Sequence, residues 1–244
     1  MRSTAAWVLV WAGWALGLGL RAEEAPSAPA PVLQARSCVL KVVAPLALNP
    51  LRNQVGSGVL VAQGLVATSA HVVVGSEAVR VEQEGQAWPA RLRALDLHRD
   101  IALLEVEGRL PAPALPAPSD PWEGERVFSW SFPGGQGPSL TMGALGFTWA
   151  YEGHWMLQAE LQVARGSSGG GLFNAEGRLL GLTTFVLDSS PHSVFVVPVA
   201  WVLDLARRPE VRVEGEAHRK TLLEGFLETL GRDPENAVRW HRFT

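Results

Sequence analysis

The feature that most constrains this chain is a long succession of short apolar segments separated by turn residues. Between Ser37 and Val199, β-branched and leucine-rich runs alternate with Gly, Pro, Asn and Asp. Such runs at close, regular spacing are typical of all-β barrels or sandwiches and not of alternating βαβ units. The strands expected from this pattern are 38–43, 58–62, 65–68, 78–82, 87–94, 101–106, 126–130, 139–147, 155–163, 170–173, 179–186 and 193–197.

Composition limits the classes of function that fit. Apolar residues make up 47% and charged residues 18% of the 244 positions, which favours a folded domain over a disordered one. The length suits one double-barrel domain or two small domains. The formal net charge is -3, and lysine and arginine form no cluster, which argues against nucleic acid or an anionic membrane surface as a partner.

The N-terminus has the pattern of a secretory signal. Met1 and Arg2 precede an apolar run over 5–20, and Ala22 follows at a cleavage position. We therefore expect a signal peptide over 1–22 and an extracytoplasmic location, in a bacterial periplasm or outside the cell. The alternative is an uncleaved anchor, because the run is close to the minimum that spans a bilayer. Only in that case would the chain associate with a membrane.

The segments that flank the strands are of a different kind. Residues 23–36 are rich in Ala and Pro, and we expect a flexible leader. The Pro-rich stretch 108–121 suits a link between two β-halves, and 198–206 suits a short helix. Within a C-terminal extension over 207–244, an amphipathic helix is expected, and it either packs on the barrels or docks another subunit. Its apolar face would carry Leu222, Leu223, Phe226, Leu227 and Leu230.

One cysteine and one histidine are informative by position. Cys38 is the only cysteine, so no intrachain disulfide can form, and we expect it in the core. His71 lies in the block GLVATSAHVV, at the point where the expected strand ends. An imidazole at a strand end suits acid-base chemistry, although a lone histidine is more often structural.

The next two blocks carry a carboxylate and a serine. In DLHRDIALL, Asp100 precedes an apolar strand, and its carboxylate could orient an imidazole, a role for which Asp96 competes. In RGSSGGGL, Ser168 lies among glycines, and a substrate can approach it closely. A linker would not lie between two apolar stretches, as this run does.

In the order His, Asp, Ser, the three blocks resemble the trypsin-like peptidases of the HtrA (Deg) type. The similarity covers about 37–205 and predicts a protease domain over 37–206 with two six-stranded antiparallel β-barrels of the chymotrypsin-like fold. The matching motifs are GSGV, ATSAHVV, DIALL, the GERV to FPG segment, GSSGG and VFVVP. Only 39 residues follow Leu205, so we expect the protease domain alone, without a PDZ domain.

The resemblance implies a serine endopeptidase of extracytoplasmic proteins that forms an acyl-enzyme. It makes Ser168 the nucleophile, His71 the general base and Asp100 its orienter, with an oxyanion hole from the backbone N–H groups of Gly166 and Ser168. No cofactor and no metal are implied. Polypeptide substrates are the expected partners, and a homo-oligomer stays open. The substrate-binding residues are expected to be Gln162, Thr183, Thr184 and Phe185.

This chain departs from the family at two positions beside the nucleophile. Ser167 stands where Asn is usual, and Gly171 stands where Pro or Ala is usual. The extra glycine predicts a flexible loop whose oxyanion hole forms only with substrate or a partner. No acidic residue is expected at the base of the specificity pocket, so a small or medium apolar side chain before the scissile bond is favoured over Lys or Arg.

Two alternatives from other classes stay open. The first is a catalytically dormant protease-like domain that binds extended peptides by strand addition. The second is a structural envelope protein held by an uncleaved N-terminal helix. Labelling of Ser168 by a covalent serine probe distinguishes the first, and a soluble form without the first 22 residues excludes the second.

Overall fold

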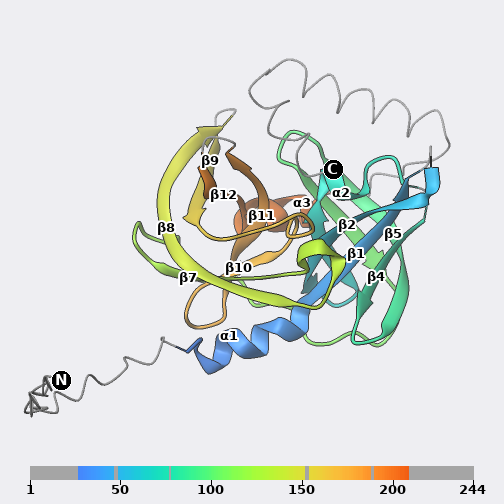
Figure 1. Ribbon diagram of the computed structural model, residues 1–244, viewed down its shortest axis with the longest axis horizontal. Coiled ribbons are helices and arrows are strands. Elements are labelled where there is room, and N and C mark those ends of the chain that lie inside the picture. The colour runs from blue at the N-terminus through green and yellow to red at the C-terminus, as the bar shows by residue number, and fades with distance from the viewer. Residues whose placement is uncertain (1–26, 47–48, 77, 152–153, 188–189, 209–244) are drawn as a thin grey trace, which may run out of the picture.

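Two closed antiparallel β-barrels, packed against each other, make up most of the molecule (Figure 1). The structure is a computed structural model that describes residues 27–46, 49–76, 78–151, 154–187 and 190–208. Each barrel has six strands, as the strand pattern and the family resemblance predicted. The fold class is therefore confirmed.

The first barrel closes by pairing of β1 with β4. Its spatial strand order is β1-β2-β3-β6-β5-β4. The strands are β1 (Val39–Leu46), β2 (Asn49–Ala62), β3 (Leu65–Ser69), β4 (Val79–Gln83), β5 (Gln86–Asp96) and β6 (Ile101–Val106). A short helix, α2 (Ala70–Val73), follows β3 directly.

The second barrel closes by pairing of β7 with β10. Its spatial strand order is β10-β11-β12-β9-β8-β7. The strands are β7 (Arg126–Ser131), β8 (Ser139–Tyr151), β9 (His154–Glu160), β10 (Gly171–Phe173), β11 (Leu179–Leu187) and β12 (Ser190–Pro198). A 3-10 turn, η2 (Pro133–Gly135), lies between β7 and β8.

The interface between the barrels is part of the main hydrophobic core. β3 is buried along its whole length, because one face lies inside the first barrel and the other faces the second. Apolar residues of the second barrel, among them Phe173, Leu182 and Phe195, join the same core. The interior of the second barrel forms a separate, smaller core. Strand ends that meet at this interface are therefore held against one another.

The segment from residue 108 to 121 joins the barrels without regular structure. Its backbone contacts both of them, because Ala114 N–H donates to the Leu60 carbonyl at 2.8 Å and Ala117 N–H donates to the Leu179 carbonyl at 2.9 Å. The second barrel follows with β7. This is the position in which the Pro-rich stretch was expected to link two β-halves.

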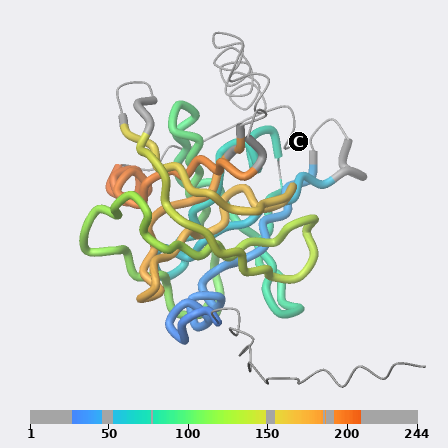
Figure 2. Tube along the Cα trace, turned by 60° about the vertical axis from the view of Figure 1, so that its left-hand side comes forward, coloured from blue at the N-terminus to red at the C-terminus, as the bar shows by residue number. Residues whose placement is uncertain are grey.

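Part of the expected leader is structured. Residues Ala30–Ala35 form α1, and the 3-10 turn η1 (Arg36–Cys38) leads into β1. Figures 1 and 2 show α1 along one end of the barrels, where the Val32 carbonyl accepts a hydrogen bond from Trp130 Nε1 at 2.7 Å. The expectation of a flexible leader over 23–36 therefore does not hold for this part. The Pro-rich composition gave no indication of this helix, which is stabilised by tertiary contacts.

Other expectations about the flanks have mixed outcomes. The helix expected over 198–206 is present as α3 (Val199–Arg207), with Val202 and Leu205 buried. Cys38 is buried as expected, and burial raises the pKa of its thiol to about 12. The proposed signal over 1–22 and the amphipathic helix near the C-terminus lie outside the described residues.

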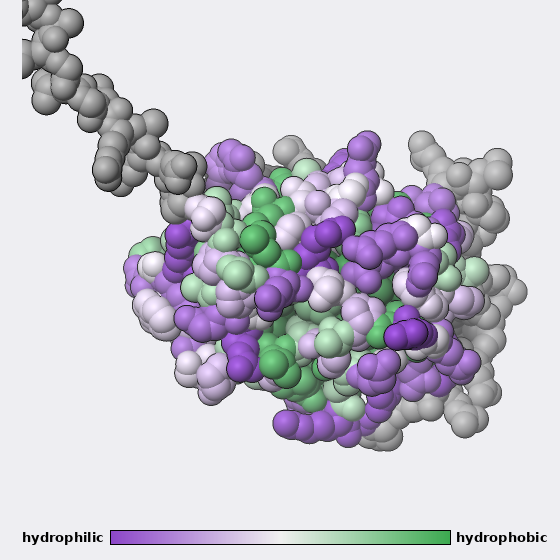
Figure 3. All heavy atoms as spheres, turned by 90° about the horizontal axis from the view of Figure 1, so that it is seen from below, coloured by the Kyte–Doolittle hydropathy of each residue, from purple (hydrophilic) through white to green (hydrophobic). Residues whose placement is uncertain are grey.

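The surface of the described region is of mixed polarity. Viewed from below, hydrophilic residues surround smaller apolar areas (Figure 3). Among the described residues, no helix has the length and apolar character needed to cross a membrane.

Candidate active site

His71 and Asp100 come from neighbouring strand ends of the first barrel. His71 lies in α2, immediately after β3, and Asp100 ends the turn between β5 and β6. Because β3 and β6 are paired, the two turns lie side by side, and Ala70 N–H donates to the Asp100 carbonyl at 3.1 Å. Asp100 has a φ of 55°, a left-handed conformation that is uncommon for residues other than glycine.

Both oxygens of the Asp100 carboxylate are occupied by hydrogen-bond donors. Oδ1 accepts from the backbone N–H of His71 at 2.9 Å, and Oδ2 lies 2.9 Å from its Nδ1. The hydroxyl of Thr184, from β11 of the second barrel, also donates to Oδ2. His71 is 4% exposed and Asp100 3% exposed, so this pair is shielded from water. The arrangement fixes the imidazole ring and favours a proton on Nδ1.

Asp96, the competing carboxylate, lies in a different environment. Its Oδ1 accepts a hydrogen bond from the Arg99 backbone N–H at 3.1 Å. Its Oδ2 lies 3.9 Å from the Arg99 guanidinium and 3.8 Å from the guanidinium of Arg208. The Arg99 guanidinium also lies 5.2 Å from the Trp201 ring centre on α3. Asp96 therefore supports the turn and its contact with α3, whereas Asp100 contacts the imidazole.

Ser168 reaches the same place from the second barrel. It lies in the loop between β9 and β10 and is 5% exposed. Its Oγ donates to the backbone carbonyl of Thr184 at 3.1 Å. Thr184 thus contacts Asp100 through its side chain and Ser168 through its carbonyl. The structure brings His71, Asp100 and Ser168 together around this one residue.

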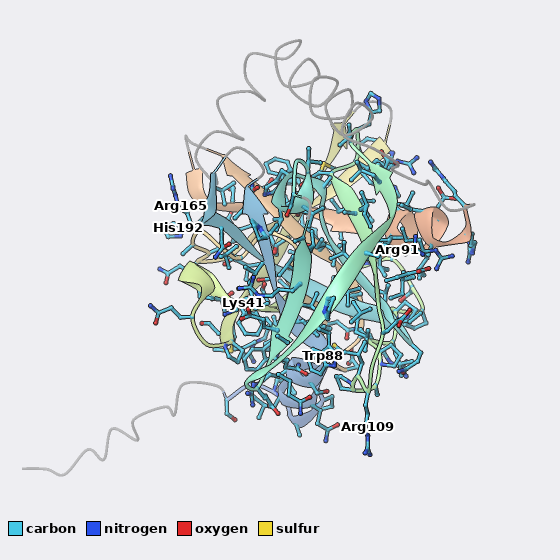
Figure 4. The ribbon with its side chains drawn as sticks, turned by 90° about the vertical axis from the view of Figure 1, so that its right-hand side faces the viewer. Lys41, Trp88, Arg91, Arg109, Arg165 and His192 are labelled. Carbon is cyan, nitrogen blue, oxygen red and sulfur yellow. The ribbon has the colours of Figure 1, made fainter. Side chains whose placement is uncertain are left out.

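The backbone beside Ser168 offers two N–H groups that could bind an anion. Gly166 has a φ of 92°, and a Cβ there would lie 2.5 Å from the Phe132 carbonyl oxygen, so only glycine fits. Within the described part of the chain, the N–H groups of Gly166 and Ser168 donate to no protein acceptor. Two available donors beside a buried hydroxyl can stabilise negative charge on an oxygen. Arg165, the residue before Gly166, is exposed at the same edge as His192 (Figure 4).

Hydrogen bonds hold the glycine-rich loop, residues 165–171, in one conformation, whereas its sequence predicted a flexible loop. Ser167 Oγ contacts Ser131 Oγ at 3.1 Å, and Gly169 N–H donates to the Thr183 carbonyl at 2.7 Å. Gly171 has a packing reason, because a Cβ there would lie 2.5 Å from the Phe173 ring. A glycine at this position makes room for an aromatic core residue.

The expected substrate-binding residues are placed differently from one another. Gln162 is exposed in the segment after β9, and Phe185 follows Thr184 in β11. The hydroxyls of Thr183 and Thr184 are both buried, and they contact the Ser167 carbonyl and Asp100 respectively. Both threonine side chains therefore face the site's own scaffold.

One residue of the site was not anticipated from sequence. Ser57 of β2 is completely buried, and it contacts the backbone of both Gly166 and Ser168. The motif GSGV drew attention to the strand, but a serine in a strand carries no local signal of such a contact. Among the described residues, no group of three or more His, Cys, Asp or Glu could hold a metal ion.

Comparison with known proteins identifies the family. A model of the trypsin-like peptidase domain matches residues 56–182, which is more than half of the chain. The chain belongs to the trypsin-like peptidase family. The matched region contains the GSGV strand and all three candidate catalytic residues.

Curated relatives of the chain include serine proteases of the HtrA and DegP type. A probable periplasmic DegP-like serine endoprotease of Halomonas elongata is 29% identical over 178 residues, covering 69% of this chain and 37% of that protein. The periplasmic serine endoprotease DegP of Salmonella typhimurium is 31% identical over 165 residues, covering 62% of this chain and 34% of that protein. The chain spans 31% to 43% of the length of these curated relatives.

Solved structures support the fold. The active form of a protease from M. tuberculosis superimposes with a TM-score of 0.69 at 23% identity, covering 78% of this chain and 91% of that one. A serine endoprotease from Yersinia pestis has a TM-score of 0.67 at 24% identity, covering 75% and 66%. At these identities the likeness shows the architecture of this trypsin-like peptidase and nothing more.

Proposed function

We propose that the chain is a serine endopeptidase in which Ser168 is the nucleophile, His71 the general base and Asp100 its orienter. The observation that carries this proposal is the buried contact of Asp100 with both the backbone N–H and Nδ1 of His71. Thr184 connects this pair to Ser168, because its hydroxyl donates to Asp100 and its carbonyl accepts from the Ser168 hydroxyl. This geometry and the family membership support the same assignment.

The proposed reaction begins when the Ser168 hydroxyl leaves the Thr184 carbonyl and turns toward Nε2 of His71. His71 accepts the hydroxyl proton as Oγ attacks the carbonyl carbon of the substrate, and Asp100 stabilises the resulting imidazolium. The N–H groups of Gly166 and Ser168 stabilise the oxyanion. His71 then donates its proton to the leaving amine, and water later hydrolyses the acyl-enzyme.

The proposed substrates are extended polypeptides that lie along β11. β10 pairs with β11 only as far as Leu182, and Gly169 and Gly170 bind the backbone of Thr183, so the edge of β11 that is left for a peptide begins at Thr184. A peptide that adds to this edge would place its carbonyl at Ser168. We propose Gln162 and Phe185 as substrate-binding residues, and we expect cleavage after a small or medium apolar residue. Peptide profiling that finds cleavage mainly after Lys or Arg would contradict this preference.

The proposed location is extracytoplasmic, in a bacterial periplasm or outside the cell. Its support is the N-terminal signal pattern together with relatives described as periplasmic. Recovery of a soluble form that begins at Glu23 from the periplasm or medium would support it. Recovery of the chain only in the membrane fraction would favour the uncleaved anchor.

A dormant peptide-binding domain is the second candidate function. It is favoured by one observation: the single Ser168 hydroxyl proton is directed at the Thr184 carbonyl. If this arrangement persists with substrate, the hydroxyl is not activated.

Reaction of the chain with a fluorophosphonate probe tests the two functions directly. We expect covalent labelling of the wild type, no labelling of Ser168→Ala, and undiminished labelling of Ser129→Ala, which removes another buried hydroxyl. A wild type that binds an extended peptide but is never labelled would support the dormant domain and overturn the peptidase.

A further inference from the structure

Ser57 connects the first barrel to the backbone of the candidate oxyanion hole. Its Oγ donates to the Gly166 carbonyl at 2.7 Å and accepts from Phe132 N–H at 2.9 Å. Its backbone N–H donates to the Ser168 carbonyl at 2.8 Å, and its carbonyl accepts from the Thr68 hydroxyl at 2.6 Å. The side chain is 0% exposed, so water cannot replace these partners. One residue of β2 thus binds the carbonyls of both residues whose N–H groups form the hole.

The Gly166 N–H belongs to a peptide unit that is fixed at its other end. In a trans peptide the N–H and C=O point in opposite directions, so fixing the carbonyl fixes the N–H. The carbonyl of this unit is that of Arg165, and it accepts from Gly134 N–H at 2.6 Å. Gly134 lies two residues after Phe132, whose N–H is bound by the Ser57 hydroxyl. Ser57 therefore supports this peptide unit through the turn that holds it.

The next peptide unit is held by Ser57 directly, through the Gly166 carbonyl. The peptide units on both sides of Gly166 are then held by hydrogen bonds, and their relative orientation gives Gly166 its φ of 92°. Gly166 has no Cβ and would otherwise rotate more freely than any other residue. Without the Ser57 hydroxyl, the peptide unit of the Gly166 carbonyl would keep, among the described residues, only the bond from the Ser167 N–H to the Ala164 carbonyl at 3.0 Å. With one restraint instead of two, it could turn and carry the Gly166 N–H away from the oxyanion.

The Ser168 N–H has an independent support. Its peptide unit carries the Ser167 carbonyl, which accepts from Thr183 Oγ1 at 2.8 Å and from Gly170 N–H at 2.9 Å. Loss of the Ser57 hydroxyl leaves both of these bonds in place. The effect of Ser57 should therefore be concentrated at Gly166, one of the two proposed donors.

We propose that Ser57 is a positioning residue of this peptidase: its hydroxyl orients Gly166 so that the N–H of that glycine stabilises the oxyanion. The proposal rests on the proposed function. Ser57 acts through the loop and does not contact substrate. It also ties the nucleophile loop of the second barrel to the barrel that carries His71 and Asp100. The hydroxyl is needed because an alanine would leave the Gly166 carbonyl and the Phe132 N–H buried without their partner.

Steady-state kinetics of Ser57→Ala on a fluorogenic peptide test this role. Loss of a whole oxyanion donor costs roughly 10²–10³ in kcat, so a misdirected donor should lower kcat about 10- to 100-fold. Because the interaction forms only in the transition state, KM should stay within about threefold of wild type. A peptide boronate, whose tetrahedral adduct places an oxygen in the hole, should lose affinity by the same factor as kcat/KM. The affinity of a product-like peptide should not change.

Ser129→Ala is the matched control, because Ser129 is also a 0% exposed serine and lies on β7 of the same fold. It should keep kcat within about twofold of wild type, as expected for a residue outside the site. If Ser57→Ala keeps wild-type kcat, or if Ser129→Ala loses as much, the proposal is overturned. If Ser57→Ala does not fold, Ser57→Cys replaces it. Its thiol is a weaker donor, so kcat should fall at constant KM, and full activity would overturn the proposal.

Amide hydrogen exchange separates this proposal from the proposed function. Exchange in the 164–170 segment should accelerate in Ser57→Ala and not in Ser129→Ala, whether or not the chain hydrolyses peptides. Faster exchange in a chain whose wild type is inactive and unlabelled would show that Ser57 holds the loop in place and would reject the peptidase. Unchanged exchange and unchanged kcat in an active enzyme would reject the positioning role alone.

Discussion

The two barrels hold their parts of the candidate site in different ways. In the first barrel the functional groups are fixed through side chains, because the Asp100 carboxylate binds His71 at two points. In the second barrel the groups are fixed through backbone carbonyls, because the loop around Ser168 is bound at successive peptide units. A charged pair keeps its geometry by strong local contacts, whereas a glycine-rich loop needs several weaker contacts from its surroundings.

Each barrel also stabilises the part that the other one supplies. Thr184 of the second barrel donates to Asp100 of the first, and Ser57 of the first binds the loop of the second. The interface is therefore more than apolar packing. Its buried polar contacts set the relative position of the proposed base, His71, and the proposed nucleophile, Ser168. Substitutions there should therefore change turnover more than they change substrate affinity.

Replacement of Asp100 should produce the largest effect among the scaffold residues. We expect Asp100→Asn to lower kcat by about 10⁴, because an amide facing Nδ1 favours the wrong histidine tautomer. The measurement is kcat on a fluorogenic peptide, with folding checked by circular dichroism. Asp96→Asn is the control and should stay within a few-fold of wild type, since Asp96 only supports its turn and α3. A larger loss in Asp96→Asn than in Asp100→Asn would reverse the assignment.

Removal of the Thr184 hydroxyl tests the contact between the barrels. A hydrogen bond to a charged group contributes roughly 1.5–3 kcal/mol, so Thr184→Val should lower kcat by about tenfold or more. Thr184→Ser keeps the hydroxyl and should recover most of the activity. Wild-type activity in Thr184→Val together with a loss in Thr184→Ser would mean that the methyl group, and not the bond to Asp100, matters.

Much of the fold was predictable from sequence because its signals are local. Strands such as β3 and β6 are apolar runs between turn residues, and their pattern is visible in a few neighbouring positions. α3 was predictable because Pro198 precedes a run with helical spacing. The helix α1 was missed because its support comes from Trp130, 98 positions away.

The candidate site was predictable in part for the same reason. His71, Asp100 and Ser168 each stand in a distinctive block, and their order matches the family. The residues alone left Asp96 and Asp100 open, and the family resemblance favoured Asp100. The structure adds the physical difference, because Asp100 contacts the His71 imidazole and Asp96 contacts the Arg99 backbone. The role of Ser57 could not be predicted from sequence, because its contact with Gly166 joins positions 109 residues apart. The residues next to either position give no local sign of this contact.

The smallest expected effect on stability comes from two acids, the half-buried Glu82 of the first barrel and the buried Glu125 beside the second. In the first barrel, Lys41 and then Arg80 lower the pKa of Glu82, whose Oε2 lies 2.6 Å from Lys41 Nζ. Beside the second barrel, burial and the nearby Glu176 raise the pKa of Glu125, and the hydrogen bond from Trp122 N–H opposes them. The two acids should therefore contribute to stability with opposite dependence on pH.

For Glu82 the folded pKa lies below the ordinary value of 4.5, so its stabilisation is present above pH 4.5 and is lost as the pH falls through the lowered pKa. Glu82→Gln should thus be less stable than wild type at pH 7, by under about 1 kcal/mol, and the difference should shrink in acid. For Glu125 the folded pKa is raised, so the stabilisation is present below pH 4.5 and is lost as the pH rises. Glu125→Gln should therefore be more stable than wild type at pH 7 and equal to it in acid.

Thermal unfolding of both variants between pH 4 and pH 7 measures this difference, with the exposed Glu123→Gln as the control. Changes in stability of opposite sign for Glu82→Gln and Glu125→Gln at pH 7 would show that the ion pair dominates at Glu82 and that burial dominates at Glu125. A loss of stability in both variants would mean that the hydrogen bond from Trp122 N–H stabilises the Glu125 carboxylate more than burial destabilises it. In that case the barrels would not differ in how they hold their charges, and their contrast would be confined to the active site.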